Sequence, residues 1–192
     1  MSKIIITYGF LFFLSLTQYG CLEIAVPKPK AFLALDYTAP TYQTIAPNLP
    51  LTFDKNELSK VNLVQNNNEI LGIDLKYKPL NAAVHISYKN VQNNLKALIQ
   101  SSLSITQQHA KIAHSISEKE FRNDSNRVYG KIFDLSGPVA SQIQFYVTDS
   151  THHFLSGALY FNKKPNYDSI YPAIRYIQKD IVRMMESMKW EN

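Results

Sequence analysis

The amino-acid sequence predicts an α+β fold, a single domain in which an antiparallel β-sheet of about six to seven strands packs against two main α-helices. Three observations support this prediction. Short segments have the two-residue period of a strand, two longer segments have the helical period, and the strands are joined by short connections. Two groups of strands, each followed by a helix, are typical of an α+β domain.

The first group of strands begins after Pro50. Four segments are apolar or alternating over strand-like lengths, and NNNE predicts a turn between two of them; the segments are LTFD, KVNLVQ, ILGIDLKY and AAVHISYKNV. The period then changes, because the apolar residues between positions 93 and 113 fit one face of a helix. Asn93 or Asn94 is the expected N-cap of this helix.

The second group consists of strands predicted at residues 126–135, 141–149 and 154–161. A helix follows, and its apolar stripe is made of Ile170, Ile174, Ile177, Ile181, Met184, Met185 and Met188. Asp168 or Ser169 would cap this helix. Pro172 would then lie in its first turn, where few backbone donors have intrahelical partners.

The N-terminus has the features of a bacterial lipoprotein signal. Lys3 precedes a short apolar run that is too short to span a membrane, and Gly20 stands directly before Cys21, the one cysteine of the sequence. We therefore expect residues 1–20 to be a signal peptide and Cys21 to carry a lipid. The alternative is a buried or incidental cysteine.

The remaining chain is expected to consist of a tether and one globular domain. Closely spaced prolines make residues 21–48 unsuitable for a helix, although the aromatic residues among them suggest that part of this tether lies against the domain. The domain itself is expected at residues 49–192. The formal net charge of +5 is spread along the chain and forms no basic stripe, so we expect no nucleic-acid partner.

Candidate catalytic groups are few. A triad of Ser87 or Ser150 with His153 and Asp149 lacks the G-x-S-x-G context of a nucleophile, and His152 and His153 would point to opposite faces of a strand and so could not share a metal. No glycine-rich phosphate loop is present in the sequence. We therefore expect a protein that is not an enzyme, with no catalytic residues, no metal site and no cofactor.

Two other roles remain open for these segments. The turn within TDSTHHF places Asp149, Ser150, His152 and His153 between two strands, and loops held by a rigid scaffold are where recognition residues gather. We therefore predict a partner-binding turn. In the alternative, the methionines of the last helix line a pocket between sheet and helices, although core packing is the favoured interpretation for such a stripe.

Several long stretches, in the same order, resemble the gliding-motility lipoprotein GldD family. They are PKPKAFLALDYTAPTYQ, AAVHISYKNVQNNLKALIQSS, the segment from RVYGKIF to RYIQKDI, and MMESMKW. The resemblance implies a lipoprotein of the envelope of Gram-negative bacteria that glide, anchored in a membrane, facing the periplasm and lipidated at Cys21. It also implies machinery shared with type IX secretion and an inner-membrane partner with CBS domains, and it brings no enzymatic activity.

The function predicted from these observations is that of a non-catalytic envelope lipoprotein. It would support the assembly or stability of the gliding and type IX secretion machinery through protein–protein contacts. The alternative is a periplasmic protein that binds or acts on a lipid or a cell-wall fragment in a pocket between sheet and helices.

Overall fold

The main sheet is antiparallel throughout, as predicted. The computed structural model describes residues 37–66, 69–162 and 166–191, which belong to one compact unit. Seven strands pair in the order β3-β4-β5-β9-β8-β7-β6. Their bounds are Lys60–Asn66 (β3), Glu69–Tyr77 (β4), Ala82–Asn90 (β5), Ser115–Asn123 (β6), Val128–Ser136 (β7), Ser141–Thr148 (β8) and His153–Phe161 (β9), and a short 3₁₀ helix, Lys78–Leu80, joins β4 to β5.

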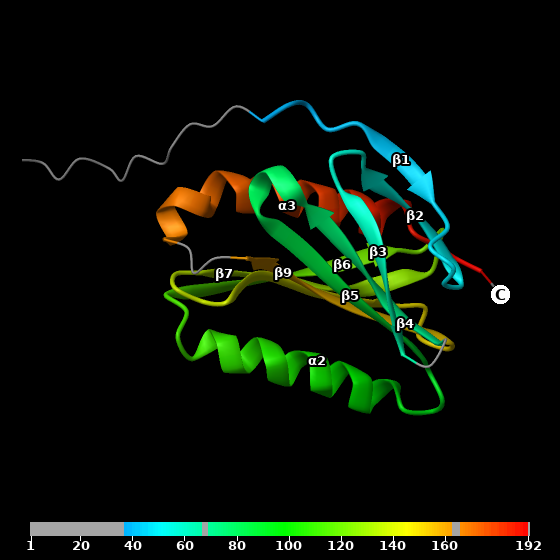
Figure 1. The fold of residues 1–192 in the computed structure, drawn as a ribbon. Coiled ribbons are helices and arrows are strands. Elements are labelled where there is room, and N and C mark those ends of the chain that lie inside the picture. Colours follow the sequence, from blue (N-terminus) through cyan, green and yellow to red (C-terminus); the bar gives the residue numbers. More distant parts are fainter. Residues whose placement is uncertain (1–36, 67–68, 163–165, 192) are drawn as a thin grey trace, which may run out of the picture. The chain divides into compact units, whose positions relative to one another are not determined.

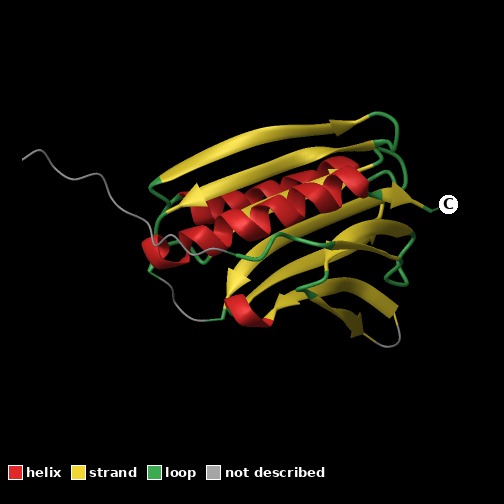
Figure 2. Ribbon diagram, turned by 90° about the horizontal axis from the view of Figure 1, so that it is seen from above, coloured by secondary structure: helices red, strands yellow, loops and turns green. Residues whose placement is uncertain are grey.

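The two helices cover opposite faces of this sheet (Figure 1). Helix α2 spans Leu95–Ala110 and helix α3 spans Tyr167–Ser187. Phe145 belongs to the larger apolar core beneath α3, whereas its neighbour Tyr146 belongs to the smaller cluster beneath α2. Strands extend on both sides of the helices when the molecule is seen from above (Figure 2). The α+β prediction with two main helices is therefore confirmed.

Strand β8 is buried along its whole length. The sequence alternates apolar and polar residues here, which predicts one buried and one solvated face. Both faces are covered, because β8 lies inside the sheet with α3 on one side and α2 on the other. The polar side chains Gln142, Gln144 and Thr148 are consequently buried beside the α2 cluster.

Three strands form a second, smaller sheet that the sequence did not predict. β1 (Tyr42–Ile45) and β10 (Lys189–Trp190) both pair antiparallel with β2 (Leu51–Asn56). Leu51 and Phe53 are fully buried and belong to the core beneath α3, which explains why this sheet lies on that side. β1 falls within residues 21–48, so this part of the predicted tether belongs to the fold.

A buried carboxyl group links this small sheet to α3. Asp180 of α3 accepts a hydrogen bond from the Tyr42 hydroxyl at 2.9 Å and another from Nδ2 of Asn56 at 2.9 Å. The hydroxyl of Tyr77, at the end of β4, bonds to the same carboxyl. Burial raises the pKa of Asp180 above its ordinary value, although the three hydrogen bonds act in the opposite direction.

The start of α3 differs from the prediction. The N-cap is Asn166, whose side chain accepts a hydrogen bond from the backbone N–H of Asp168 at 3.2 Å. The helix therefore begins at Tyr167, and Pro172 lies inside it rather than in its first turn. The N-cap of α2 is Asn94, which is one of the two residues expected there. Its side chain accepts a hydrogen bond from the backbone N–H of Gln92 and none from the helix.

Strand β6 forms one edge of the main sheet and carries mostly charged and polar residues. Glu118 pairs with Lys131 of the neighbouring strand β7. Charged side chains of this kind protect an exposed strand from pairing with another chain. Among the described residues, no helix combines the length and the apolar composition needed to cross a membrane.

Candidate functional site

The predicted lipidation site, Cys21, lies outside the described residues. The predicted signal peptide and the first half of the tether lie outside them as well. Lipidation of Cys21 therefore stays a prediction of the sequence.

The predicted partner-binding turn joins β8 to β9 and is organised by Asp149. One oxygen of this carboxylate accepts hydrogen bonds from the backbone N–H groups of Thr151, His152 and His153 at 2.8–3.0 Å. The other oxygen accepts from the Thr151 hydroxyl at 2.8 Å. Ser150 has a positive φ of 73°, a conformation that lets the chain reverse within so few residues.

Asp149 holds its negative charge firmly. Burial raises the pKa of this carboxyl, but the hydrogen bonds from His153, His152 and Thr151 stabilise the charged form more strongly. The net effect sets the pKa of Asp149 well below its ordinary value. The Asp149 carboxylate thus mainly stabilises the backbone of the turn. Asp149 is only 5% exposed to solvent.

His153 is also committed to contacts within the fold. Its Nδ1 lies 2.7 Å from the Tyr88 hydroxyl, and its ring stacks on Trp190 with 5.1 Å between ring centroids and an angle of 4°. Burial lowers the pKa of His153, which favours the neutral imidazole, although the charge of Asp149 acts in the opposite direction. Of the four predicted turn residues, Ser150 and His152 are the exposed ones.

Two residues that sequence analysis did not single out complete this end of the molecule. Arg127, in the turn between β6 and β7, donates a hydrogen bond to the Thr151 hydroxyl at 3.2 Å. Nε1 of Trp190 donates to the backbone oxygen of Arg127 at 3.1 Å. The three segments are distant in the sequence, so no local pattern could have predicted that they meet.

The weak catalytic candidates do not come together as a triad. The Asp149 carboxylate is occupied by the backbone of its own turn, and the ring of His153 contacts Tyr88 and Trp190 rather than a serine. In the described part of the chain, no group of three or more histidine, cysteine, aspartate or glutamate residues is arranged to hold a metal ion.

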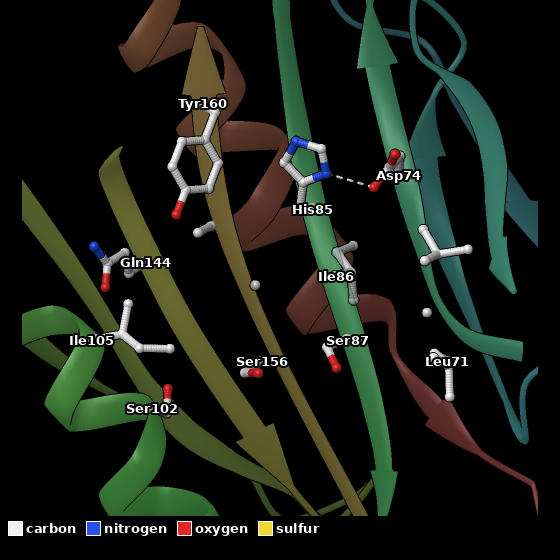
Figure 3. A pocket seen from close by; sticks show the side chains of 14 residues that line it. Leu71, Asp74, His85, Ile86, Ser87, Ser102, Ile105, Gln144, Ser156 and Tyr160 are labelled. Carbon is white, nitrogen blue, oxygen red and sulfur yellow. Dashed lines mark hydrogen bonds and ion pairs between the residues drawn. The ribbon is translucent and has the colours of Figure 1, made fainter. Parts of the chain in front are cut away.

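A groove of about 430 Å³ opens on the α2 side of the sheet, between that helix and the strands it leaves uncovered (Figure 3). We call it the α2 groove. Its floor comes from β4, β5 and β9, and Ser102 and Ile105 of α2 form one wall. Met184, Met185 and Met188 are buried in the core on the α3 side, so the core interpretation of the methionine stripe is confirmed.

Comparison with known proteins identifies the chain. No curated protein sequence matches it well enough to serve as a relative. A protein-family model described as "Gliding motility lipoprotein GldD" matches residues 23–190, which include every strand and helix that the structure describes. Membership of a lipoprotein family implies a membrane-anchored protein of the cell envelope. The chain therefore belongs to the family of gliding motility lipoproteins GldD.

Proposed function

We propose that this protein is a non-catalytic, membrane-anchored component that supports the assembly or stability of the gliding and type IX secretion machinery. Its lipid would be carried by Cys21, and the folded domain would face the periplasm and contact an envelope protein, with an inner-membrane CBS-domain protein as the expected partner. The observation that carries the proposal is the family match over residues 23–190.

The structure supports a scaffold role through the way it presents the β8–β9 turn. The Asp149 carboxylate bonds the backbone of the turn, Arg127 bonds the Thr151 hydroxyl, and Trp190 stacks on the ring of His153. The His152 side chain stays 75% exposed. A turn held in one conformation loses little entropy when a partner binds. The exposed face of Ser150 and His152 is thus suited to recognition.

The role in secretion and movement is tested by deleting the gene. We expect the deletion strain to lose both surface spreading and delivery of a type IX cargo to the medium. The wild-type gene should restore both, whereas Cys21→Ala should restore neither despite normal amounts of protein. Normal spreading and secretion in the deletion strain would refute the proposal, and full rescue by Cys21→Ala would refute the need for the lipid.

The turn is tested separately by pull-down of the envelope partner with the full chain. His152→Ala changes an exposed side chain of the turn, and His114→Ala changes an exposed histidine in the α2–β6 connection, near the opposite ends of the strands. We expect His152→Ala to reduce recovery of the partner and His114→Ala to leave it unchanged. Equal recovery with both variants would remove the turn from the proposal.

A further inference from the structure

The α2 groove continues into a second hollow that is basic. Asp74 and His85 line both spaces, and the second has a volume of about 420 Å³. Lys76 and Lys78 line the second hollow together with Asn162. Within the part of the chain that the structure describes, neither lysine forms an ion pair. Nζ of Lys76 donates to the side-chain oxygen of Asn62 at 2.8 Å, which leaves this ammonium group further N–H donors for an anion. Both lysines can therefore contribute positive charge at this end.

The other end of the α2 groove has apolar walls. Ile105 of α2 is 48% exposed and Leu71 of β4 is 41% exposed, and the two stand on opposite sides of the groove (Figure 3). The floor between them carries the short side chains of Ser87 and Ser156. Large aliphatic side chains left exposed around a hollow are typical of an interaction site.

A row of side chains crosses the groove between these two ends. Strand pairing places Gln144, Ala158, His85 and Asp74 side by side on β8, β9, β5 and β4. Nδ1 of His85 lies 2.6 Å from the Asp74 carboxylate, which fixes the orientation of the imidazole ring. The row thus has one polar group near α2 and a second near the basic hollow.

Gln144 is the less expected member of this row. It is 4% exposed, and its Oε1 accepts a hydrogen bond from the Thr106 hydroxyl at 2.8 Å. Its Nε2 has no partner among the described residues. Nε2 is itself buried, so this amide is not open to a ligand in the groove and belongs to the packing between β8 and α2.

We propose that the α2 groove binds an amphiphile with one apolar chain and an oxygen-rich anionic head. The chain lies between Ile105 and Leu71, and the negative charge of the head faces Lys76 and Lys78. A fatty acid and a phospholipid head group share this chemistry. The proposal goes beyond the scaffold function and does not depend on it.

Native mass spectrometry of the full mature chain, released from detergent micelles, tests the ligand class. The probes are dodecanoate, lysophosphatidylglycerol and the uncharged methyl dodecanoate. We expect a saturable one-to-one adduct with at least one anionic probe and binding of methyl dodecanoate weaker by about tenfold or more. The anionic probe that binds more tightly identifies the source as a free fatty acid or a lipid head group.

Matched variants locate the adduct. Ser87→Phe fills the floor of the α2 groove, and Ser117→Phe makes the same change at an exposed position of β6 outside it. We expect Ser87→Phe to weaken binding of the anionic probe by about tenfold or more and Ser117→Phe to leave it unchanged. Equal binding by the two variants would overturn the assignment to this groove.

Removal of the two lysines tests the head end without disturbing the core. The double variant Lys76→Ala/Lys78→Ala should weaken binding of the anionic probe by about tenfold and leave methyl dodecanoate unaffected. Lys111→Ala/Lys119→Ala removes two exposed charges elsewhere and should change neither. The proposal fails if wild-type protein forms no saturable adduct with either anionic probe, or if the methyl ester binds as tightly as dodecanoate.

Discussion

Replacing Asp180 with alanine should destabilise the domain, because this carboxyl is the shared acceptor that joins α3 to the small sheet. Two of its donors, on Asn56 and Tyr77, are only 2% and 1% exposed. A buried donor that loses its acceptor lowers the free energy of unfolding by about 1–3 kcal/mol, so the loss of the acceptor for these two donors lowers it by about 2–6 kcal/mol. The half-buried Tyr42 hydroxyl can turn to water and adds little.

One effect acts against this loss. The raised pKa of Asp180 shows that its charged form is held at a cost in the folded state, and alanine removes that cost. We therefore expect the free energy of unfolding to fall by about 2–4 kcal/mol, in the lower part of the range set by the two donors. Lys179→Ala, at the exposed position just before Asp180 in the same helix, should change the free energy of unfolding by less than about 0.5 kcal/mol.

Urea unfolding followed by the fluorescence of Trp190, the one tryptophan of the sequence, measures both variants. A loss of stability in Asp180→Ala no larger than that in Lys179→Ala would refute the reasoning.

The pH dependence of stability in the variant Asp180→Asn provides a second check. Since the folded pKa of Asp180 is raised, ionisation disfavours folding, so wild type should gain stability relative to Asp180→Asn as pH falls from 7 towards 3.8, the ordinary pKa of an aspartate.

Three further substitutions test other parts of the structure. Asp149→Asn should lower the free energy of unfolding by about 2–3 kcal/mol at pH 7 by weakening charge-assisted hydrogen bonds to the turn. Because the folded pKa of Asp149 is lowered, its contribution is present above the unfolded value of 3.8, and the difference should shrink as pH falls below it. Gly157→Ala places a methyl group against the ring of Phe145 and the backbone oxygen of His85, and it should lower the free energy of unfolding by about 1–3 kcal/mol, measured by urea unfolding. Met185→Ala leaves a cavity in the core and should cost about 2–5 kcal/mol, seen as a lower thermal midpoint; a change below about 0.5 kcal/mol would contradict its burial.

The elements predicted well from the sequence are those that have a long periodic pattern, with one face against the core and the other face against solvent. Helix α3 is the best example, because Ile174, Ile177 and Ile181 recur at helical spacing and all face the core. Its starting point was misplaced because a local capping contact at Asn166, rather than periodicity, decides where the helix begins. Capping depends on the conformation of one residue, which a period cannot indicate.

The small sheet was missed for a different reason. β10 has two residues and β1 has four, which is too short for an alternation to be recognised. Both strands form because β2 offers its two edges while Leu51 and Phe53 hold it against α3. This stabilisation comes from tertiary contacts, which the local sequence pattern does not indicate.

In the candidate sites, too, features that depend on local contacts could be predicted, whereas features that depend on distant residues could not. Asp149 could be recognised as a turn residue because its bonds are local, whereas the burial of His153 depends on Trp190, which is distant in the sequence. The α2 groove could not be predicted. Its floor residues, such as Ser87 and Ser156, have the pattern of an ordinary polar strand face, and they form a hollow only because α2 covers the neighbouring strands.

The attachment of β1 also determines how the domain responds to mechanical tension. A force applied through the chain ahead of Tyr37 first reaches the ring contact of Tyr37 with Tyr176 of α3 and then the hydrogen bonds between Thr41 and Glu57. It next reaches β1, whose four residues pair antiparallel with Phe53 to Asn56 of β2. A pull directed along the strand loads all of these pairs in shear at once, whereas a pull away from the sheet peels them one at a time, starting with Tyr42. Within β1, the residue that meets the peeling force first is thus the one that Asp180 and the Arg183 guanidinium hold to α3.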